Sequence, residues 1–275
     1  PWSDEDITYQ ANHIAGSLVN NGGFNCVASR VIVTHAQWNQ REQLIEGILE
    51  ALAAHPERHP YYPGAELRWQ EFIDEHPDAH IIGPTGESRV PWTLIEGVDP
   101  DDAGNIAFTA EAFNGVFAET ALDVDRDVGI FLEEAVKFAN DTLWGTLGVS
   151  IIAHPTTMND PVIGEALEQA VADLRYGSVG VNCWTALNYA LGNPSWGAFP
   201  GHTRDDIRSG VGVVHNTYLF DHPQKSVVRA PFRAWPAPFW HVGGSGDALV
   251  RKLADFEADP KSWRLPGILS AALRG

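Results

Sequence analysis

The chain has 275 residues, of which 44% are hydrophobic and 20% charged, and it carries a formal net charge of −18. This composition is typical of a folded globular protein and excludes a disordered chain. A chain this acidic is a poor partner for nucleic acid or an anionic membrane, because both attract basic patches. Its length allows one large domain or two ordinary ones.

The two cysteines, Cys26 and Cys183, are far apart in the sequence and form no C-x-x-C pair. This usage excludes a disulfide scaffold and a zinc–cysteine site, and the histidines do not cluster at metal-ligand spacing, so we expect no metal. No apolar run approaches the roughly 20 residues of a membrane span, and no secretory segment opens the sequence. We therefore expect a soluble, cytoplasmic protein in which Cys26 stays a thiol.

The first predicted element is a helix over residues 3–19, with apolar residues at helical spacing and a capping box formed by Ser3 and Asp6. The β-branched run 31–33 predicts a buried strand. A second helical pattern starts at Trp38 and stops at His55-Pro56, because a proline disfavours the helical conformation of the residue before it.

Helical and strand patterns alternate through the middle of the chain. The patterns predict helices over 67–73, 133–140 and 163–174, and strands over 81–82, 93–95, 149–152 and 178–182. This alternation indicates an α/β fold with a mostly parallel twisted sheet and helices on both faces.

The composition changes at residue 231, where a stretch rich in proline and aromatic residues begins. We therefore expect one domain over residues 1–230 and an irregular C-terminal extension over 231–275. The extension contains a helix at 248–256 and an apolar tail from Leu265. Such an extension packs on its own domain or on a neighbouring subunit, and we expect a homo-oligomer.

Residues 20–30 place Cys26 on a loop that contains two adjacent glycines, Gly22 and Gly23. Because glycines take positive φ without strain, amide N–H groups beside Cys26 could face a reacting carbonyl. The alternative is that the glycines only end the helix and Cys26 is a small buried residue. A histidine base for Cys26 could be His35, His202 or His215, and the spacing selects none of them.

Five short runs carry a family resemblance. In chain order they are Asn21-Gly22-Gly23-Phe24-Asn25-Cys26, Glu111-Ala112-Phe113-Asn114-Gly115-Val116, Phe138-Ala139-Asn140-Asp141 with Trp144-Gly145, Gly177-Ser178-Val179-Gly180-Val181-Asn182, and Trp196-Gly197 with Ser209-Gly210-Val211-Gly212. In this order they resemble five segments of the NAD(P)-dependent aldehyde dehydrogenase superfamily: Gly-Gln-x-Cys, Glu-x-Phe-Gly-Pro-Val, Ala-Asn-x-x-x-Tyr-Gly-Leu, Gly-x-Val-x-Val-Asn, and Phe-Gly-Gly with Ser-Gly-x-Gly.

The resemblance implies the catalytic domain of an aldehyde dehydrogenase, which oxidises an aldehyde to an acid through a cysteine thiohemiacetal and thioester. Cys26 would be the nucleophile, and its N–H would form half of an oxyanion hole. Glu111, by itself a solvated carboxylate at a loop edge, would hold the nicotinamide ribose of NAD or NADP, and Phe113 would pack beside the ring.

This chain departs from the family pattern in several places. Phe24 stands where the family has glutamine, Arg30 follows Cys26 by four positions where we expect five, and Asn114-Gly115 replaces Gly-Pro. The family's general-base glutamate and cofactor domain come well before the cysteine, whereas only 25 residues precede Cys26 here. The resemblance therefore implies the catalytic portion alone, with its own N-terminal cofactor domain as a partner.

Two other functions fit the same sequence. The chain could be an oligomerisation or interaction module without chemistry of its own, or a relative that transfers the acyl group to coenzyme A through the same thioester.

Overall fold

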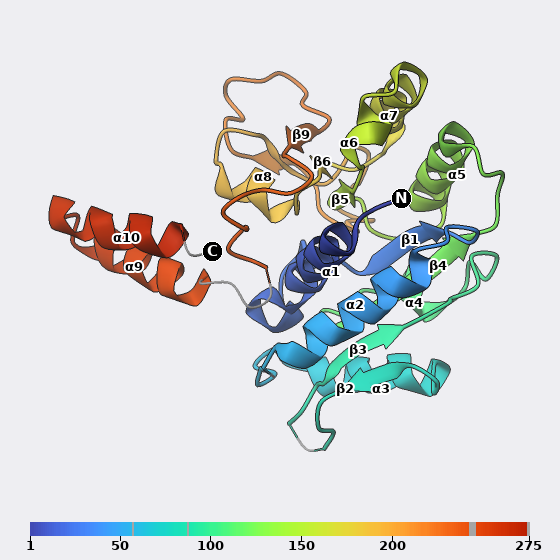
Figure 1. The fold of residues 1–275 in the computed structure, drawn as a ribbon, viewed down its shortest axis with the longest axis horizontal. Coiled ribbons are helices and arrows are strands. Elements are labelled where there is room, and N and C mark those ends of the chain that lie inside the picture. Colours follow the sequence, from blue (N-terminus) through green and yellow to red (C-terminus); the bar gives the residue numbers. More distant parts are fainter. Residues whose placement is uncertain (57, 87, 242–245, 274–275) are drawn as a thin grey trace.

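The computed structural model describes residues 1–56, 58–86, 88–241 and 246–273, and its fold is α/β as predicted (Figure 1). Four strands form one sheet in the order β1 (Val31–His35), β4 (Val116–Leu122), β3 (Trp92–Ile95) and β2 (His80–Ile82). A second sheet contains β5 (Gly148–Ile151), β6 (Ser178–Val181) and β9 (Ser226–Arg229), and the short strands β7 (Trp196–Gly197) and β8 (Val213–Val214) pair with each other.

Parallel pairing dominates the two larger sheets, and only β2–β3 among their pairs is antiparallel. The helices, in chain order, are α1 (Asp4–Val19), η1 (Asn20–Gly23), α2 (Arg41–Ala54), α3 (Ala65–Glu75), α4 (Ile106–Thr109), α5 (Val128–Asp141), α6 (Pro155–Met158), α7 (Pro161–Asp173), α8 (Ala186–Ala190), α9 (Gly246–Ala258), η2 (Ser262–Arg264) and α10 (Leu265–Ala272).

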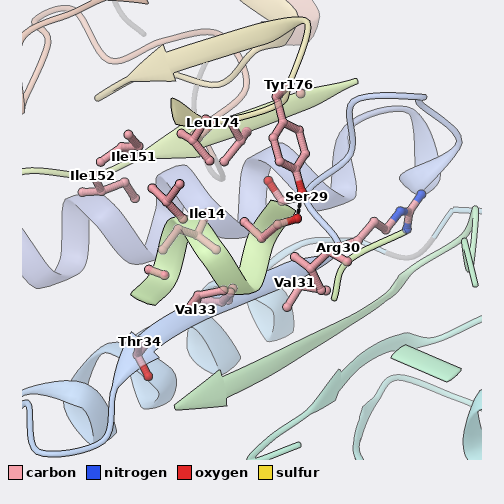
Figure 2. A pocket seen from close by; sticks show the side chains of 18 of the residues that line it. Ile14, Ser29, Arg30, Val31, Val33, Thr34, Ile151, Ile152, Leu174 and Tyr176 are labelled. Atoms are coloured by element: carbon pink, nitrogen blue, oxygen red, sulfur yellow. Dashed lines mark hydrogen bonds between the residues drawn. The ribbon is translucent and has the colours of Figure 1, made fainter. Parts of the chain in front are cut away.

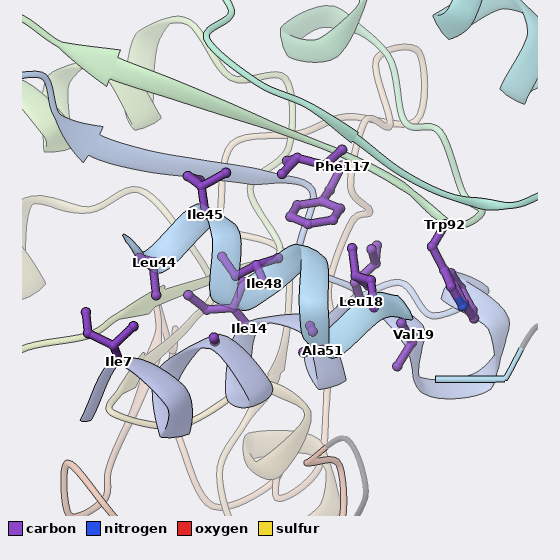
Figure 3. Close-up of a cluster of buried hydrophobic side chains, with 14 residues drawn as sticks. Ile7, Ile14, Leu18, Val19, Leu44, Ile45, Ile48, Ala51, Trp92 and Phe117 are labelled. Atoms are coloured by element: carbon purple, nitrogen blue, oxygen red, sulfur yellow. The ribbon is translucent and has the colours of Figure 1, made fainter. Parts of the chain in front are cut away.

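Successive residues of β4 point to opposite faces of the first sheet. Phe117 joins a core cluster with α1 and α2, whose residues include Leu18 and Ile48 (Figure 3). Val116 and Ala118 join a second cluster, which packs under α3, α4 and α5. Both faces are therefore covered by helices, which confirms the predicted layering.

Helix α1 begins with the predicted capping box: Asp6 N–H donates to Ser3 Oγ at 3.2 Å, and Ser3 N–H donates to Asp6 Oδ2 at 2.9 Å. Helix α5 begins at Val128, five residues before the predicted start at 133. The reason is Asp127, whose carboxylate accepts hydrogen bonds from Gly129 N–H and Ile130 N–H and so caps the helix earlier.

The sequence patterns do not predict β4, although it is central to the first sheet. Its middle residue, Glu119, is fully buried, although glutamate is depleted in strands and a buried carboxylate is costly. Arg41 donates to both carboxylate oxygens of Glu119, and Thr34 Oγ1 and Gly97 N–H donate to it as well. The ion pair and hydrogen bonds offset the cost of burying this charge.

Residues 231–241 pack on α1 of the same chain. Gln10 Nε2 donates to Phe232 O at 2.6 Å, and Ala234 N–H donates to the hydroxyl of Tyr9 at 2.9 Å. The ring of His241 lies against that of His13, with centroids 5.5 Å apart. Residues 242–245 and 274–275 of the predicted extension lie outside the described residues.

Helices α9 and α10 pack on each other and stand apart from the two sheets in Figure 1. No helix within the described ranges is long and apolar enough to cross a membrane.

Candidate active site

Cys26 lies in a tight turn between α1 and β1, which Ala28 N–H closes by donating to Asn25 O at 3.1 Å. Asn21, Gly22 and Gly23, just before the turn, have φ values of 54°, 70° and 79°. The positive φ that the glycine pair predicts is thus present. Gly23 is also required for space, because a Cβ atom there would collide with the backbone carbonyl of Asn114.

The Cys26 side chain is exposed, whereas that of Cys183 is buried. The alternative in which Cys26 is a small buried residue is therefore wrong, because the turn holds the thiol at the surface of a large cavity that it helps to line. Desolvation by neighbouring protein atoms raises the pKa of the Cys26 thiol, and the negative charge of Glu111 raises it further. A hydrogen bond from the Cys26 amide N–H acts in the opposite direction.

Glu111 comes from the loop before β4 and lies within electrostatic reach of Cys26. Its pKa is raised by desolvation, against the opposing effect of Arg30 and Arg68. The structure therefore brings together the thiol and the carboxylate, 85 positions apart in the sequence, that the resemblance singled out.

Arg30 ties the cysteine loop to the Glu111 segment. Its Nη2 donates to Gly23 O at 2.5 Å, and its Nη1 donates to Asn114 O at 2.5 Å and to Val116 O at 3.2 Å. Burial lowers the pKa of this guanidinium to about 10. Its Nε is buried and has no hydrogen-bond partner among the described residues.

Arg68 of α3 holds the same segment from the other side, because its Nε donates to Ala112 O at 2.9 Å. Nothing in the sequence singles out Arg68 as a site residue. Its partner is a backbone carbonyl 44 positions away, and no local pattern signals such a contact.

Phe113 sits in an aromatic cluster with Phe24 and Tyr62. Its ring centroid is 4.8 Å from that of Tyr62 and 6.2 Å from that of Phe24. Phe24, the residue that replaces the family's glutamine, is buried in this cluster. Phe113 has a φ of 45°, a conformation that phenylalanine rarely adopts, and it remains half-buried.

The histidines that could serve as a base have other partners. His35 Nε2 contacts Asp125 O at 3.0 Å, His202 Nε2 contacts Thr146 Oγ1 at 2.7 Å, and the ring of His215 packs on Tyr189. Within the described ranges, none of the three forms a hydrogen bond with Cys26, and no group of three or more metal-ligating side chains is found.

Two asparagines in the family-like runs have structural roles. Asn140 accepts from Arg175 N–H at 2.7 Å and donates to Asp173 O at 2.9 Å, and so joins α5 to the end of α7. Asn182 accepts from Ala153 N–H and donates to Ala153 O, and so joins the ends of β5 and β6. These contacts hold α5 against α7 and β5 against β6.

Glu111 and Phe113, the two residues that the resemblance assigns to the cofactor, are both accessible to a ligand. The Glu111 carboxylate is exposed and accepts no hydrogen bond from the described part of the protein, so its oxygens are available to vicinal hydroxyl groups. The ring of Phe113 lies beside the partly exposed ring of Tyr62.

No protein-family model and no curated protein sequence matches the chain. Solved structures do match. The NAD-dependent aldehyde dehydrogenase from Sinorhizobium meliloti has 18% identity and a TM-score of 0.58, with 80% of this chain and 41% of that chain covered.

The NADP-dependent glyceraldehyde-3-phosphate dehydrogenase from Bacillus halodurans C-125, solved with NADP, has 17% identity and a TM-score of 0.58. The match covers 76% of this chain and 40% of that chain. The gamma-glutamyl-gamma-aminobutyraldehyde dehydrogenase from Burkholderia cenocepacia J2315 has 21% identity and a TM-score of 0.56. The match covers 77% of this chain and 40% of that chain. The chain spans about 40% of the length of these structures. It therefore has the fold of one part of an aldehyde dehydrogenase, as the resemblance predicted.

Proposed function

We propose that this chain is the catalytic portion of an NAD(P)-dependent aldehyde dehydrogenase, with Cys26 as the nucleophile. The observation that carries the proposal is the position of Cys26: an exposed thiol on a turn with positive φ, beside Glu111. The shared fold supports this assignment.

The chemistry follows from the side chains at the turn. The Cys26 sulfur adds to the aldehyde carbonyl carbon, and the amide N–H of Cys26, which lies close to the sulfur, stabilises the developing oxyanion. A thiol suits this role because sulfur is a strong nucleophile and the thioester it forms is reactive toward water. Arg30 and Arg68 keep the Glu111 segment against the cysteine loop by holding its carbonyls.

Glu111 and Phe113 would hold NAD or NADP from this chain's side, through the ribose hydroxyls and the face of the ring. When bound, the nicotinamide supplies a hydride acceptor. The rest of the dinucleotide would lie on an N-terminal cofactor domain, the expected partner of this chain.

An acyl donor that needs no cofactor tests the nucleophile directly. We expect p-nitrophenyl acetate to acetylate Cys26 in the purified chain, with the adduct located by peptide mass spectrometry. Cys26→Ala should abolish it. Cys183→Ala should leave it unchanged, because burial protects Cys183 and raises its pKa to about 11. Equal acetylation of the Cys26→Ala variant would refute the proposal.

The α9–α10 hairpin favours a second candidate function, that of an oligomerisation module. Leu265, Leu269 and Leu273 are four residues apart and 48%, 61% and 48% exposed, and Val250 of α9 is 51% exposed. Residues 246–273 carry four acidic and four basic residues, so they add no net charge to a chain of −18. Two hairpins can therefore approach each other without the repulsion expected between other surfaces.

Sedimentation of the purified chain tests this second function. We expect a dimer that Leu269→Glu converts to a monomer, because a charge in an apolar interface is poorly solvated. Leu67→Glu, at a leucine of α3 that is 72% exposed, is the matched control. A wild-type chain that stays monomeric at all concentrations excludes the candidate.

A further inference from the structure

Three buried polar atoms lie together where residues 231–241 cover α1. They are Nε2 of His13, Nε1 of Trp240 and Nε2 of His241, and within the described ranges none of them has a hydrogen-bond partner. Their residues are only 3%, 6% and 8% exposed. The ring of His13 contacts both of the others, with centroids 5.7 Å from Trp240 and 5.5 Å from His241. Since each buried polar group without a partner is costly, three in one place indicate a ligand site.

The packing around these three residues holds them in place. A Cβ atom on Gly16 would collide with the backbone carbonyl of Trp240, so the glycine lets this carbonyl lie directly on α1. Trp184 packs against the ring of Trp240 with centroids 5.8 Å apart, and Tyr9 packs against the ring of His241 with centroids 4.4 Å apart. Side chains that are fixed before binding lose little conformational entropy when a ligand arrives.

A cavity gives access to the site. The cavity has a volume of about 960 Å³, lies between the two larger sheets and has His13 among its lining residues. Figure 2 shows Ile14, the next residue of α1, with Ile151 and Ile152 around the same space. The exposed residue Glu111 also lines the cavity, so it opens to solvent. A small solute that enters the cavity therefore meets His13.

The three side chains decide which class of ligand fits. The indole N–H of Trp240 donates a hydrogen bond and cannot ligate a metal cation, so it requires an acceptor. A neutral imidazole donates from Nε2 in one of its two tautomers, so His13 and His241 can donate to the same acceptor. Three donors around one acceptor favour an anion.

The other charged groups of this interface pair with one another. Arg233 forms ion pairs with Glu5 and Asp6, and His154 Nε2 lies 3.9 Å from Asp6 Oδ2. Desolvation raises the pKa of Tyr9, which therefore stays neutral. A buried anion without a positive charge beside it is costly, so a histidine of the site must take up a proton as the anion binds.

We propose that His13, Trp240 and His241 bind one small monovalent anion, a halide or a short carboxylate, together with one proton. The proton comes from solvent. In the free chain, burial lowers the pKa of His241 to about 4 and that of His13 to about 3, so His241 is the more easily protonated of the two. No step involves Cys26, and the proposal is therefore independent of the proposed function.

Chlorine-35 NMR tests the proposal in the purified chain, because bound chloride broadens the signal of free chloride. The bound state holds one proton more than the free state, so the affinity should rise up to tenfold per pH unit as the pH falls toward about 4. The excess line width should therefore increase between about pH 7.5 and 5.5. Competition by formate and acetate separates the two sources: carboxylates that bind remove the broadening, whereas a site for halides alone keeps it.

Trp240→Phe removes the indole donor and keeps an aromatic ring, so we expect the pH-dependent broadening to be lost. Trp235→Phe, at an exposed tryptophan of the same segment, is the matched control and should behave like the wild type. His241→Phe should remove the pH dependence. Equal, pH-dependent broadening in Trp240→Phe and the wild type would refute the site, because the chloride would then bind elsewhere on the surface.

Proton uptake checks the proposal without any variant, so the test stands even where Trp240→Phe does not fold. Chloride or formate added to the weakly buffered wild-type chain near pH 6 should raise the pH, in excess of a blank without protein, by about one proton per bound anion. Binding without proton uptake refutes the proposal. So does the absence of broadening, which is the result expected where a water molecule bonds the three groups.

Discussion

The Glu111 carboxylate influences the charge of Cys26 although the two residues belong to different segments. The Glu111 carboxylate adds to the rise in the pKa of the Cys26 thiol that desolvation causes. A nucleophile with a raised pKa is mostly protonated at neutral pH. Binding that neutralises or moves Glu111 would therefore increase the thiolate fraction, which couples the cofactor side of the site to the reactivity of the thiol.

Glu111→Gln isolates this effect. Because the substitution removes a negative charge and keeps the shape, we expect the pKa of Cys26 to fall. The measurement is the rate of alkylation by iodoacetamide as a function of pH, with Cys183 as the slow internal reference. A pH profile that does not move would show that Glu111 has no electrostatic effect on the thiol.

Arg30 has a structural effect at the same site. Replacing it with alanine leaves the carbonyls of Gly23, Asn114 and Val116 without their donor, so we expect a loss of at least about 3 kcal/mol in unfolding free energy. Urea denaturation measures the loss. Arg126→Ala, at an exposed arginine whose one hydrogen bond within the described residues goes to Gln37 Oε1, should change stability by less than about 1 kcal/mol. A similar loss in both variants would contradict this account.

At the scale of single residues, the sequence predicts the positive φ of Gly22 and Gly23 in the cysteine loop, because glycine takes positive φ without strain. It does not predict the contacts of Arg30. Two of its three acceptors lie 84 and 86 positions away, and a carbonyl has no sequence signature. The exposure of Cys26 also depends on tertiary packing, so the sequence alone allows either a buried or an exposed thiol.

At the scale of elements, β4 depends on one buried carboxylate. Glu119→Ala would leave Arg41 facing an apolar strand, and we expect a loss of roughly 3–5 kcal/mol in unfolding free energy. Glu119→Gln keeps the acceptor for Thr34 Oγ1 and should lose less. Urea denaturation of both variants checks the order, and equal stability of Glu119→Ala and the wild type would contradict the assigned role.

Glu119 also explains why sequence patterns predict several strands of the fold and miss β4. Strand β1 is a run of β-branched residues, β5 and β6 carry valine or isoleucine at alternate positions, and α7 has apolar residues at helical spacing, so local patterns find them. Strand β4 reads Val-Phe-Ala-Glu-Thr-Ala-Leu, in which alanine and glutamate favour a helix. Arg41, 78 positions away, stabilises the buried carboxylate of Glu119 in the strand together with Thr34 and Gly97.

At the scale of the whole molecule, two buried histidines join the start of the chain to its late segment. Burial lowers the pKa of His13 to about 3 and that of His241 to about 4, from 6.5. The unfolded chain therefore binds more protons, and the stability that neutral histidines provide is complete above pH 6.5 and declines as the pH falls toward 4.

We expect the unfolding free energy to fall by roughly 1.4 kcal/mol per pH unit for each histidine in this window. Denaturant titrations between pH 7 and 4.5 measure the slope. His241→Phe should reduce the slope, whereas His59→Gln, at an exposed histidine, should not. An unchanged slope in His241→Phe would show that another group titrates there.

The contact between Gln10 and Phe232 spans 222 positions of sequence. Helix α1 is therefore synthesised more than 200 residues before its partner, and one of its faces cannot be covered until residues 231–241 have left the ribosome. Contacts of such high sequence separation slow folding and leave apolar surface exposed in the meantime. During synthesis, the α1 face that residues 231–241 later cover is thus the surface most in need of a chaperone.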